Sequence, residues 1–319
     1  MSVRRPSSDD PVVADLLARC SFPPAEGADG PDLAVAVSGG ADSLSLLALA
    51  VATGRPTTAV HVDHGLRPGS EAEAELVAAV CRDWGAAFEA RSVDVADGPD
   101  LEARARAARH AVLPEGTLFG HTADDQAETV LLRLLRGTGP SGLAAMRPDR
   151  HPLLRLRRAE TESLCAHLGV VPFEDPANRD PRFTRNRVRH EVLPLLADVA
   201  GRDTVPLLAR LAELAGAQAD VLDAVALLVD PTDAAELAAL PPALAATAVR
   251  SWWRSTTGLD HPPDAAAVAR VVAVAAGSAK ACDVVAGWSV RRTAGRLRLV
   301  GPAAVDGSPV PDADEVAQG

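Results

Sequence analysis

The sequence contains no tyrosine and a single lysine, Lys280, and aromatic residues make up only 3% of it. It also lacks a run of about 18 uncharged apolar residues, which a membrane-spanning helix would need. Two arginines near the N-terminus are not followed by an apolar segment, so we expect no secretory signal peptide. The four cysteines lie far apart without a CxxC pair. This spacing argues against a disulfide framework or a zinc site and favours reduced thiols in the cytoplasm.

The length and charge of the chain set further bounds. Its 319 residues allow about two domains, and 47% apolar residues are enough for a substantial core. The net charge of −11 argues against nucleic acid, but the acidic excess lies in residues 1–130, and residues 131–319 are balanced. Arginines gather in the balanced part, within residues 179–189 and 291–298. On charge alone these clusters are solvated faces, yet local patches decide where phosphates are attracted.

Segments typical of strands and of helices alternate in the first part of the chain. Apolar runs typical of strands occupy residues 32–38, 57–63, 88–95 and 117–121. Helical spacing and end signals occupy residues 41–54, 70–85, 101–113 and 122–137. This alternation predicts an α/β fold with a doubly wound, mostly parallel sheet.

The pattern changes after residue 137. A loop rich in glycine and proline precedes a predicted helix near residues 158–168, and Ala/Leu-rich helices broken by prolines follow from about residue 200. Residues 280–300 alternate with turn glycines and predict a small β-meander. We expect an α/β domain over residues 1–200, a helical linker over 201–235, a small α+β domain over 236–302 and a disordered tail over 303–319.

The sequence SGGADS, from Ser38 to Ser43, joins a predicted strand to a predicted helix. Gly39 and Gly40 let the backbone approach a ligand, and their N–H groups at a helix start suit an anion such as phosphate. The alternative is a tight turn in which Asp42 or Ser43 caps the helix. The motifs GxxxxGK(S/T) and GxGxxG are absent, which argues against a Walker-type site and a dinucleotide fingerprint.

Two further polar clusters follow predicted strands, so they would lie at the same sheet edge as the glycine loop. The first contains Asp63 and His64, which a simple turn also explains. The second places Asp124, Asp125 and Glu128 within one helical turn. A helix dipole accommodates one or two of these acids, but Asp124 and Glu128 repel each other at i,i+4. The cluster therefore indicates a bound cation, either Mg²⁺ or a substrate ammonium.

Five segments together resemble the tRNA(Ile)-lysidine synthetase family of N-type ATP pyrophosphatases. They read AVSGGADSLSLL, HVDHGLRPGS, LEARARAAR, GHTADDQAETVLLRLLRGTGPSGLAAM and FEDPANRDPRFTRNRVRHEVLPLL, and they cover nearly all of residues 33–196 in order. The resemblance implies an adenine nucleotide alpha hydrolase-like catalytic domain over residues 1–200 and a small tRNA-binding domain over 236–302. Members of the family ligate L-lysine to C2 of the wobble cytidine in the CAU anticodon of tRNA(Ile). ATP adenylates the base, AMP and pyrophosphate are released, and the specificity of the tRNA changes from Met to Ile.

The resemblance also implies partners and site residues. The cofactors are ATP and Mg²⁺, the location is cytoplasmic without membrane attachment, and a homodimer is left open. ATP binding falls to Ser38, Gly39, Gly40, Ala41, Asp42, Ser43 and His64. Lysine and tRNA binding fall to His121, Asp125, Glu128, Arg185, Arg187 and Arg189, and metal binding to Asp42 and Asp124. The catalytic residues are Asp42, Asp124, Asp125, Glu128 and Arg189.

Two departures and two alternatives accompany this interpretation. Any family position that is filled by tyrosine is altered here, and 319 residues leave no room for the additional C-terminal domain of longer relatives. One alternative is another pyrophosphate-loop enzyme, such as a tRNA thiolase or an amide-forming synthetase, although the cysteine spacing speaks against thiolation. The other is a nucleotide sensor without chemistry, which would not need the acidic cluster at residues 124–128.

Overall fold

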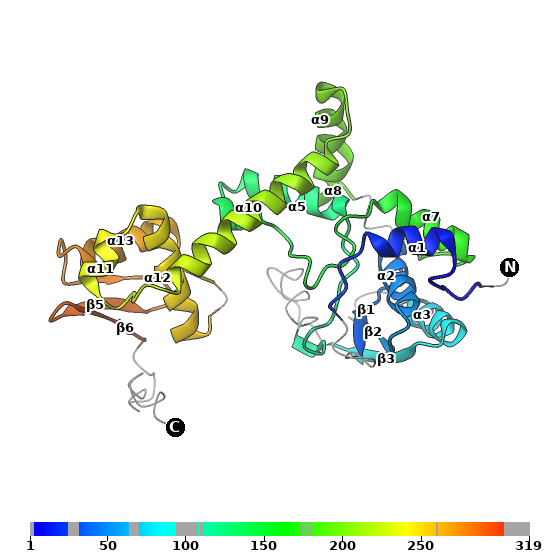
Figure 1. The fold of residues 1–319 in the computed structure, drawn as a ribbon, viewed down its shortest axis with the longest axis horizontal. Coiled ribbons are helices and arrows are strands. Elements are labelled where there is room, and N and C mark those ends of the chain that lie inside the picture. The colour runs from blue at the N-terminus through cyan, green and yellow to red at the C-terminus, as the bar shows by residue number, and fades with distance from the viewer. Residues whose placement is uncertain are drawn as a thin grey trace. The chain divides into compact units, whose positions relative to one another are not determined.

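The computed structural model describes residues 3–24, 32–63, 70–93, 108, 111–173, 175, 178, 180–259 and 261–302 (Figure 1). The chain forms two compact units, Met1–Gly216 and Ala217–Gly319. The tail expected over residues 303–319 lies outside the described residues, and so does most of the helix expected over 101–113. The finer division into domain and linker stays a prediction.

The first unit contains a parallel sheet in the order β1 (Leu33–Ala36), β2 (Thr57–Asp63) and β3 (Ala87–Ser92). The strand expected over residues 117–121 is reduced to one parallel bridge between Val35 and Leu118. The parallel sheet predicted from the alternation is confirmed.

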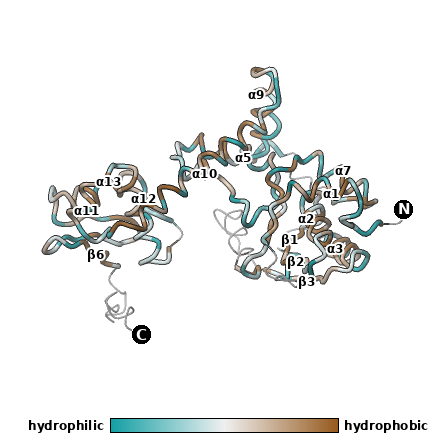
Figure 2. The backbone as a smooth tube through the Cα atoms, in the orientation of Figure 1, coloured by the Kyte–Doolittle hydropathy of each residue, from teal (hydrophilic) through white to brown (hydrophobic). Residues whose placement is uncertain are grey.

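Helix α2 (Ala41–Ala52) is the centre of the first unit's core. It packs against β1, β2, α1 (Pro11–Ala18), α3 (Ser70–Trp84) and α7 (Arg158–Leu168). Because it has neighbours on opposite sides, its leucines are all fully buried, and the tube of this helix is mostly hydrophobic in Figure 2. The continuous apolar run after the glycine loop therefore reflects a helix enclosed between layers.

The remaining helices of the first unit bring its polar residues together. Helix α5 (Ala123–Leu135) carries the acidic cluster, and α6 (Pro140–Leu143) follows it. The arginine-rich segment forms α8 (Thr184–Arg187), a π-helical turn at Val188–Val192 and α9 (Leu193–Ala200), and α10 (Val205–Ala226) comes next. Single π-helical turns occur often at functional sites.

The second unit is a small α+β body. Helices α11 (Ala234–Ala239), α12 (Pro242–Thr257) and α13 (Ala265–Ala275) precede the strands β4 (Ala281–Asp283), β5 (Ser289–Thr293) and β6 (Arg296–Val300). The strands form an antiparallel sheet in the order β4-β5-β6, which confirms the predicted β-meander. Helix α12 begins with a proline in its first turn, where the missing N–H costs no hydrogen bond. Among the described helices of both units, none is long and apolar enough to cross a membrane.

Candidate active site

The glycine loop connects the carboxyl end of β1 to the start of α2. Gly39 has a φ of 85°, a backbone conformation that favours glycine, and its carbonyl accepts the N–H of Phe173 at 2.9 Å. Helix α2 begins after Gly40 without a side-chain cap, so the N–H groups of its first turn have no partner within the helix. The hydroxyl of Ser43 instead accepts the N–H of Ser38 at 3.2 Å and donates to the carbonyl of Gly40 at 2.9 Å. No side chain caps the start of α2, and an uncapped helix start of this kind suits an anion.

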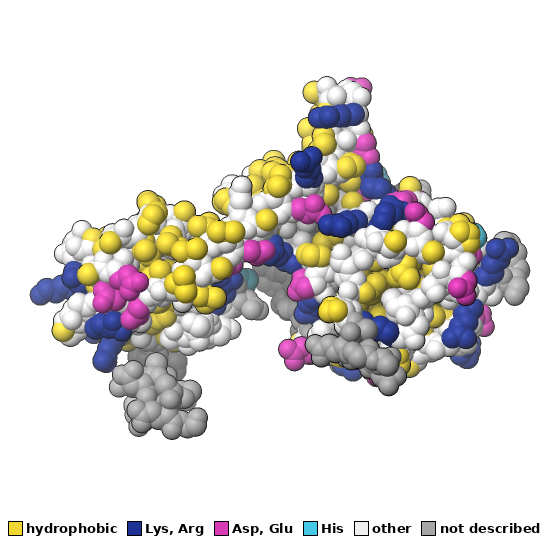
Figure 3. Space-filling model, in the orientation of Figure 1, with side chains coloured by type: hydrophobic (Ala, Val, Ile, Leu, Met, Phe, Trp, Pro, Cys, Tyr) yellow, Lys and Arg dark blue, Asp and Glu magenta, His cyan; other side chains and the backbone are white. Residues whose placement is uncertain are grey.

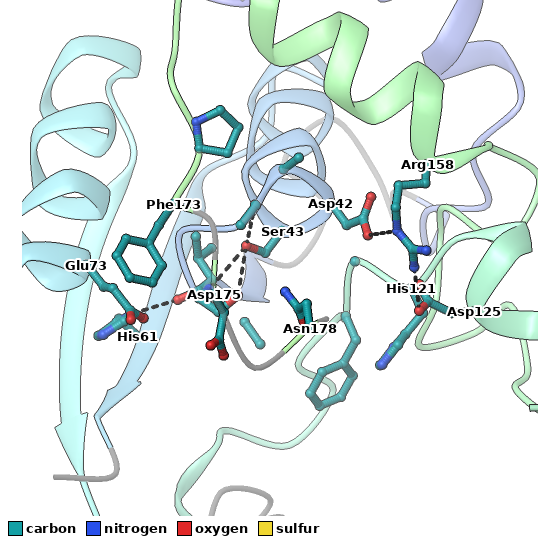
Figure 4. Close-up of a pocket in the computed structure, with 18 of the residues that line it drawn as sticks. Asp42, Ser43, His61, Glu73, His121, Asp125, Arg158, Phe173, Asp175 and Asn178 are labelled. Carbon is teal, nitrogen blue, oxygen red and sulfur yellow. Dashed lines mark hydrogen bonds and ion pairs between the residues drawn. The ribbon is translucent and has the colours of Figure 1, made fainter. Parts of the chain in front are cut away.

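A cavity of about 910 Å³ lies in front of this loop (Figure 4). Its volume is within the range of small-molecule sites, about 300–1,000 Å³. The predicted site residues that line it are Ser38, Gly40, Ala41, Asp42, Ser43, His121, Asp125 and Arg189. Residues from the glycine loop, α5 and the arginine-rich segment therefore meet in one place, as expected from the sheet edge. His64 lies outside the described residues.

Asp125 and Glu128 of α5 lie against guanidinium groups. The Glu128 side chain is completely buried, and its two oxygens accept Arg189 Nε at 2.6 Å and Arg185 Nε at 2.7 Å. Asp125 Oδ1 accepts Arg158 Nη2 at 2.9 Å and Arg185 Nη2 at 3.0 Å. The sequence indicated Mg²⁺ or a substrate ammonium as the cation beside these acids. In the structure the chain's own arginines balance them.

Arg158 connects this acid pair to the glycine loop. Its Nε lies 3.3 Å from Asp42 Oδ2, its Nη2 lies 2.9 Å from Asp125 Oδ1, and its Nη1 lies 3.4 Å from Glu128 Oε1. The residue is the first of α7, and Figure 4 shows its side chain between Asp42 and Asp125. Each side-chain nitrogen of Arg158 thus has a carboxylate partner.

Asp42 and Asp125, two of the carboxylates that line the cavity, have opposite pKa shifts. Burial raises the pKa of Asp42 to about 6, and the charge of Asp125 adds to the effect, although Arg158 and the hydroxyl of Thr161 oppose it. Burial also disfavours the ionised form of Asp125. The positive charges of Arg158, His121 and Arg185 outweigh it and bring the Asp125 pKa down to about 2. Asp125 is therefore ionised at neutral pH, whereas the carboxyl group of Asp42 titrates close to neutral pH.

Asp124 is not among the described residues that line the cavity. Its carboxylate accepts Arg157 Nε at 3.0 Å and Arg157 Nη2 at 3.1 Å, and it also accepts the backbone N–H of Arg158 at 2.8 Å. These contacts hold the first turn of α7 in place and lower the pKa of Asp124 in spite of its burial. The two residues expected to bind a metal are therefore not brought together in the cavity.

The arginine-rich segment divides into two groups. Arg185 and Arg189 turn toward the acid pair, whereas Arg187 pairs with Glu191 at 2.9 Å and keeps a side chain that is 60% exposed. The four-residue spacing of Arg185 and Arg189 places both on one face of the helix. The sequence assigned all three arginines to lysine or tRNA binding and favoured Arg187 and Arg189, and the structure brings Arg185 and Arg189, but not Arg187, to the acid pair.

His121 also lies in the cavity, next to a second histidine. Its Nδ1 is 3.0 Å from Nδ1 of His151, and the two rings meet edge to face at 4.8 Å between centroids. One Nδ1 must donate and the other accept, so the two rings are not protonated at both of these atoms while the hydrogen bond lasts. The contact fixes the orientation of His121 beside Asp125.

Sequence reasoning missed Arg158, Phe173, Asp175, Asn178 and Glu162, which also line the cavity. A signal existed for Arg158. Two consecutive arginines, Arg157 and Arg158, stand at the start of α7, where the helix dipole disfavours positive charge. Cations kept at such a position indicate carboxylate partners from elsewhere in the chain.

Comparisons with known proteins match both units. A model described as the PP-loop domain matches residues 17–196, and one described as the TilS substrate binding domain matches residues 233–298. The tRNA(Ile)-lysidine synthase of Nocardia farcinica is 49% identical over 240 residues, covering 70% of this chain and 75% of the relative. The chain belongs to the tRNA(Ile)-lysidine synthase family. The family resemblance found in the sequence, with its α/β fold and its expectation of an enzyme, is confirmed.

Other relatives agree with this assignment. The tRNA(Ile)-lysidine synthase of Rhodococcus opacus is 46% identical over 245 residues, covering 72% of this chain and 75% of the relative. The one from Mycobacterium tuberculosis is 42% identical over 239 residues, covering 68% and 73%. Among solved structures, the U34-tRNA thiolase NcsA of Methanococcus maripaludis is 15% identical with a TM-score of 0.45, covering 63% of this chain and 76% of that one.

Proposed function

We propose that this chain uses ATP to join L-lysine to C2 of the wobble cytidine in the CAU anticodon of tRNA(Ile). The observation that carries the proposal is the single cavity shared by the glycine loop and the acid–arginine cluster. A nucleotide bound at the loop and an amine bound at the acids would lie on opposite sides of one activated base. Such positioning supplies most of the rate in transfers of this kind.

The glycine loop would bind the triphosphate. The N–H groups at the start of α2 and the hydroxyls of Ser38 and Ser43 are suitable donors to phosphate oxygens. Asp42 lines the cavity and would hold Mg²⁺, which would offset phosphate charge. Mg²⁺ in nucleotide sites is usually bound by one or two carboxylates and the phosphates, so the lack of a three-ligand cluster among the described residues is no obstacle. For Asp124 we propose an anchoring role on α7.

The acid pair would bind the ε-ammonium of lysine. Asp125 is better suited as a counter-ion than as a base, because its pKa of about 2 is far below the working pH. His121 lies in the same cavity, and in its neutral form its imidazole would take the proton that the ammonium loses. The freed amine would then attack C2 of the base while AMP leaves with the former base oxygen.

The second unit would hold the tRNA. Arg291 of β5 and Arg298 of β6 are direct cross-strand partners, and both are exposed. Arginine side chains on neighbouring exposed strand positions suit contacts with the phosphates of a tRNA. Basic side chains gather at the end of this unit where β5 and β6 lie, beside a group of acidic ones (Figure 3).

Radiolabelled lysine tests the function directly. The protein, ATP, Mg²⁺ and labelled lysine are incubated with a tRNA(Ile) transcript that carries the CAU anticodon. We expect label in the tRNA, with one AMP and one pyrophosphate released for each lysine. The same transcript with uridine at the wobble position is the control and should stay unlabelled. Labelling of both transcripts, or release of ADP instead of AMP, would overturn the proposal.

Thiolation, the second candidate, is less well supported. None of the four cysteines is among the residues that line the cavity. Burial raises the pKa of Cys165 to about 11, so its thiol is not activated, although it lies close to the glycine loop. Sulfide in place of lysine should therefore give no product. We also propose a cytoplasmic location, in keeping with free thiols and a tRNA substrate, and the homodimer stays a prediction.

A further inference from the structure

The acid pair is occupied in the structure by positive charge from the protein itself. Glu128 is completely buried, and both of its oxygens accept hydrogen bonds from arginines. Asp125 Oδ1 accepts Arg158 and Arg185, and Asp125 Oδ2 accepts the N–H of Thr122 at 2.9 Å. A lysine ammonium cannot reach these oxygens unless a guanidinium moves.

The charge count leads to the same conclusion. Three carboxylates, Asp42, Asp125 and Glu128, face three guanidinium groups, Arg158, Arg185 and Arg189. The charges balance, so the cluster has no net negative charge left to attract an ammonium. Displacement of one guanidinium from the acid pair would remove the competition for its oxygens.

Of the three arginines at the acid pair, Arg158 is the one whose position would allow it to move away from the pair. Arg185 and Arg189 hydrogen-bond to the acids of α5, whereas Arg158 also contacts Asp42 in the glycine loop at 3.3 Å. The guanidinium group of Arg158 thus bridges Asp42 and the acid pair. The guanidinium group lines the cavity, and guanidinium groups pair strongly with phosphate oxygens.

We propose that Arg158 is a positioning residue that couples the nucleotide subsite to the lysine subsite. Without nucleotide, it holds the oxygens of Asp125 and Glu128 that the lysine ammonium needs. Phosphates at the glycine loop draw it away, and lysine then binds. Nucleotide and lysine therefore bind in that order, and each raises the affinity of the other by the same factor. This inference rests on the proposed function.

Equilibrium dialysis of radiolabelled lysine against the full chain tests the coupling. It is done with Mg²⁺, with and without an ATP analogue whose α–β bridging oxygen is replaced by methylene, because the enzyme would cleave that bond in ATP. We expect the analogue to lower the dissociation constant of lysine by about tenfold or more, within the usual range of coupling between sites. The reciprocal titration of the analogue with and without lysine must give the same factor.

Three variants separate coupling from structure. Arg158→Gln should bind lysine without nucleotide, and the analogue should change its affinity less than about twofold. Arg158→Lys keeps the charge but has one ammonium for three carboxylates, so its coupling should be intermediate. Arg155→Gln is the matched control, since Arg155 is 66% exposed and pairs only loosely with Glu213 at 3.5 Å. Its coupling should equal that of the unaltered protein. Melting curves confirm that each variant is folded.

The outcomes distinguish this inference from the proposed function. If lysine binds the unaltered protein equally well with and without the analogue, the coupling is refuted and the ligase function stands. If Arg158→Gln keeps the full coupling factor, another residue carries it and Arg158 does not. If lysine binds under no condition and the labelling assay also fails, the proposed function itself is overturned. If Arg158→Gln does not fold, the unaltered protein and Arg158→Lys decide the question.

Discussion

Gly120 lies so close to the start of α2 that a Cβ atom there would be 2.6 Å from the carbonyl oxygen of Asp42. It would also be 3.0 Å from the Cα of Ser43. Both neighbours are backbone atoms, so neither can turn aside as a flexible side chain would. The segment that leads into α5 therefore contacts the end of the glycine loop directly. The distance between the glycine loop and the acid pair depends on this contact.

Replacement of Gly120 by alanine should push the two segments apart. We expect the KM for ATP to rise at least about tenfold, and the free energy of unfolding to fall by about 1–3 kcal/mol, as in other overpacked positions. Steady-state kinetics and urea unfolding measure the two effects. Gly139→Ala is the control, because Gly139 has a φ of −83° and nothing within 4 Å of an added Cβ. Equal effects in both variants would contradict the close-contact explanation.

The sequence was sufficient for the elements and for the glycine loop because both depend on local patterns. Apolar runs, helical spacing and the cluster SGGADS predicted β1, β2, β3 and α2 close to their observed bounds. The strand expected near Leu118 is reduced to one bridge, and two residues later Gly120 contacts the start of α2. That contact is tertiary, and no local pattern reveals it.

The pairing of charges in the site could not be obtained in the same way. Arg158 meets Asp42 across 116 residues of sequence and Asp125 across 33. The sequence indicated that the acidic cluster needs a cation. It could not show that arginines distant in the sequence supply the positive charge, because only the folded chain brings them to the acids. The direction of the Arg189 side chain, toward Glu128, likewise depends on the π-helical turn, which the sequence did not indicate.

The two arginines Arg187 and Arg189 should respond very differently to substitution by glutamine. Arg189→Gln leaves buried Glu128 with one guanidinium fewer, so we expect lysine transfer to fall about 100-fold, as for other misplaced catalytic groups. Arg187→Gln breaks only an exposed pair with Glu191, and lysine transfer should change less than about twofold. Single-turnover labelling of the tRNA measures both. A large loss in Arg187→Gln would mean that this exposed side chain contacts the tRNA.

The cysteines should react in order of exposure and pKa. Cys165 is buried and its pKa is raised to about 11, so iodoacetamide at pH 8 should leave it unmodified in the folded protein. Cys282 is only partly buried and should be alkylated first. Mass spectrometry of a labelling time course, repeated in urea, provides the measurement. Rapid labelling of native Cys165 would point to an activated thiol and would revive the thiolase alternative.

Asp42 should make the folded protein less stable at neutral pH than a neutral side chain would. Its pKa rises from 3.8 to about 6 on folding, so the ionised form is disfavoured in the folded state. This corresponds to about 3 kcal/mol at pH values above 6. The penalty shrinks as the pH falls from 6 and is gone below 3.8, where the group is neutral in both states. Asp42→Asn should therefore raise the free energy of unfolding at pH 7.5, by about 1–3 kcal/mol, while it abolishes the ligase activity.

Asp125→Asn provides the comparison of opposite sign in the same cavity. The pKa of Asp125 falls from 3.8 to about 2 on folding, so its ionised form stabilises the protein above pH 3.8 and loses this effect as the pH falls through 2. The variant should therefore be less stable than the unaltered protein at pH 7.5, by about 2 kcal/mol or more, because it also leaves buried arginines unpaired. Urea unfolding at pH 7.5 and pH 4 measures both variants. Shifts of the same sign for the two variants at pH 7.5 would show that burial, rather than the arrangement of the arginines, sets the charge of both carboxylates.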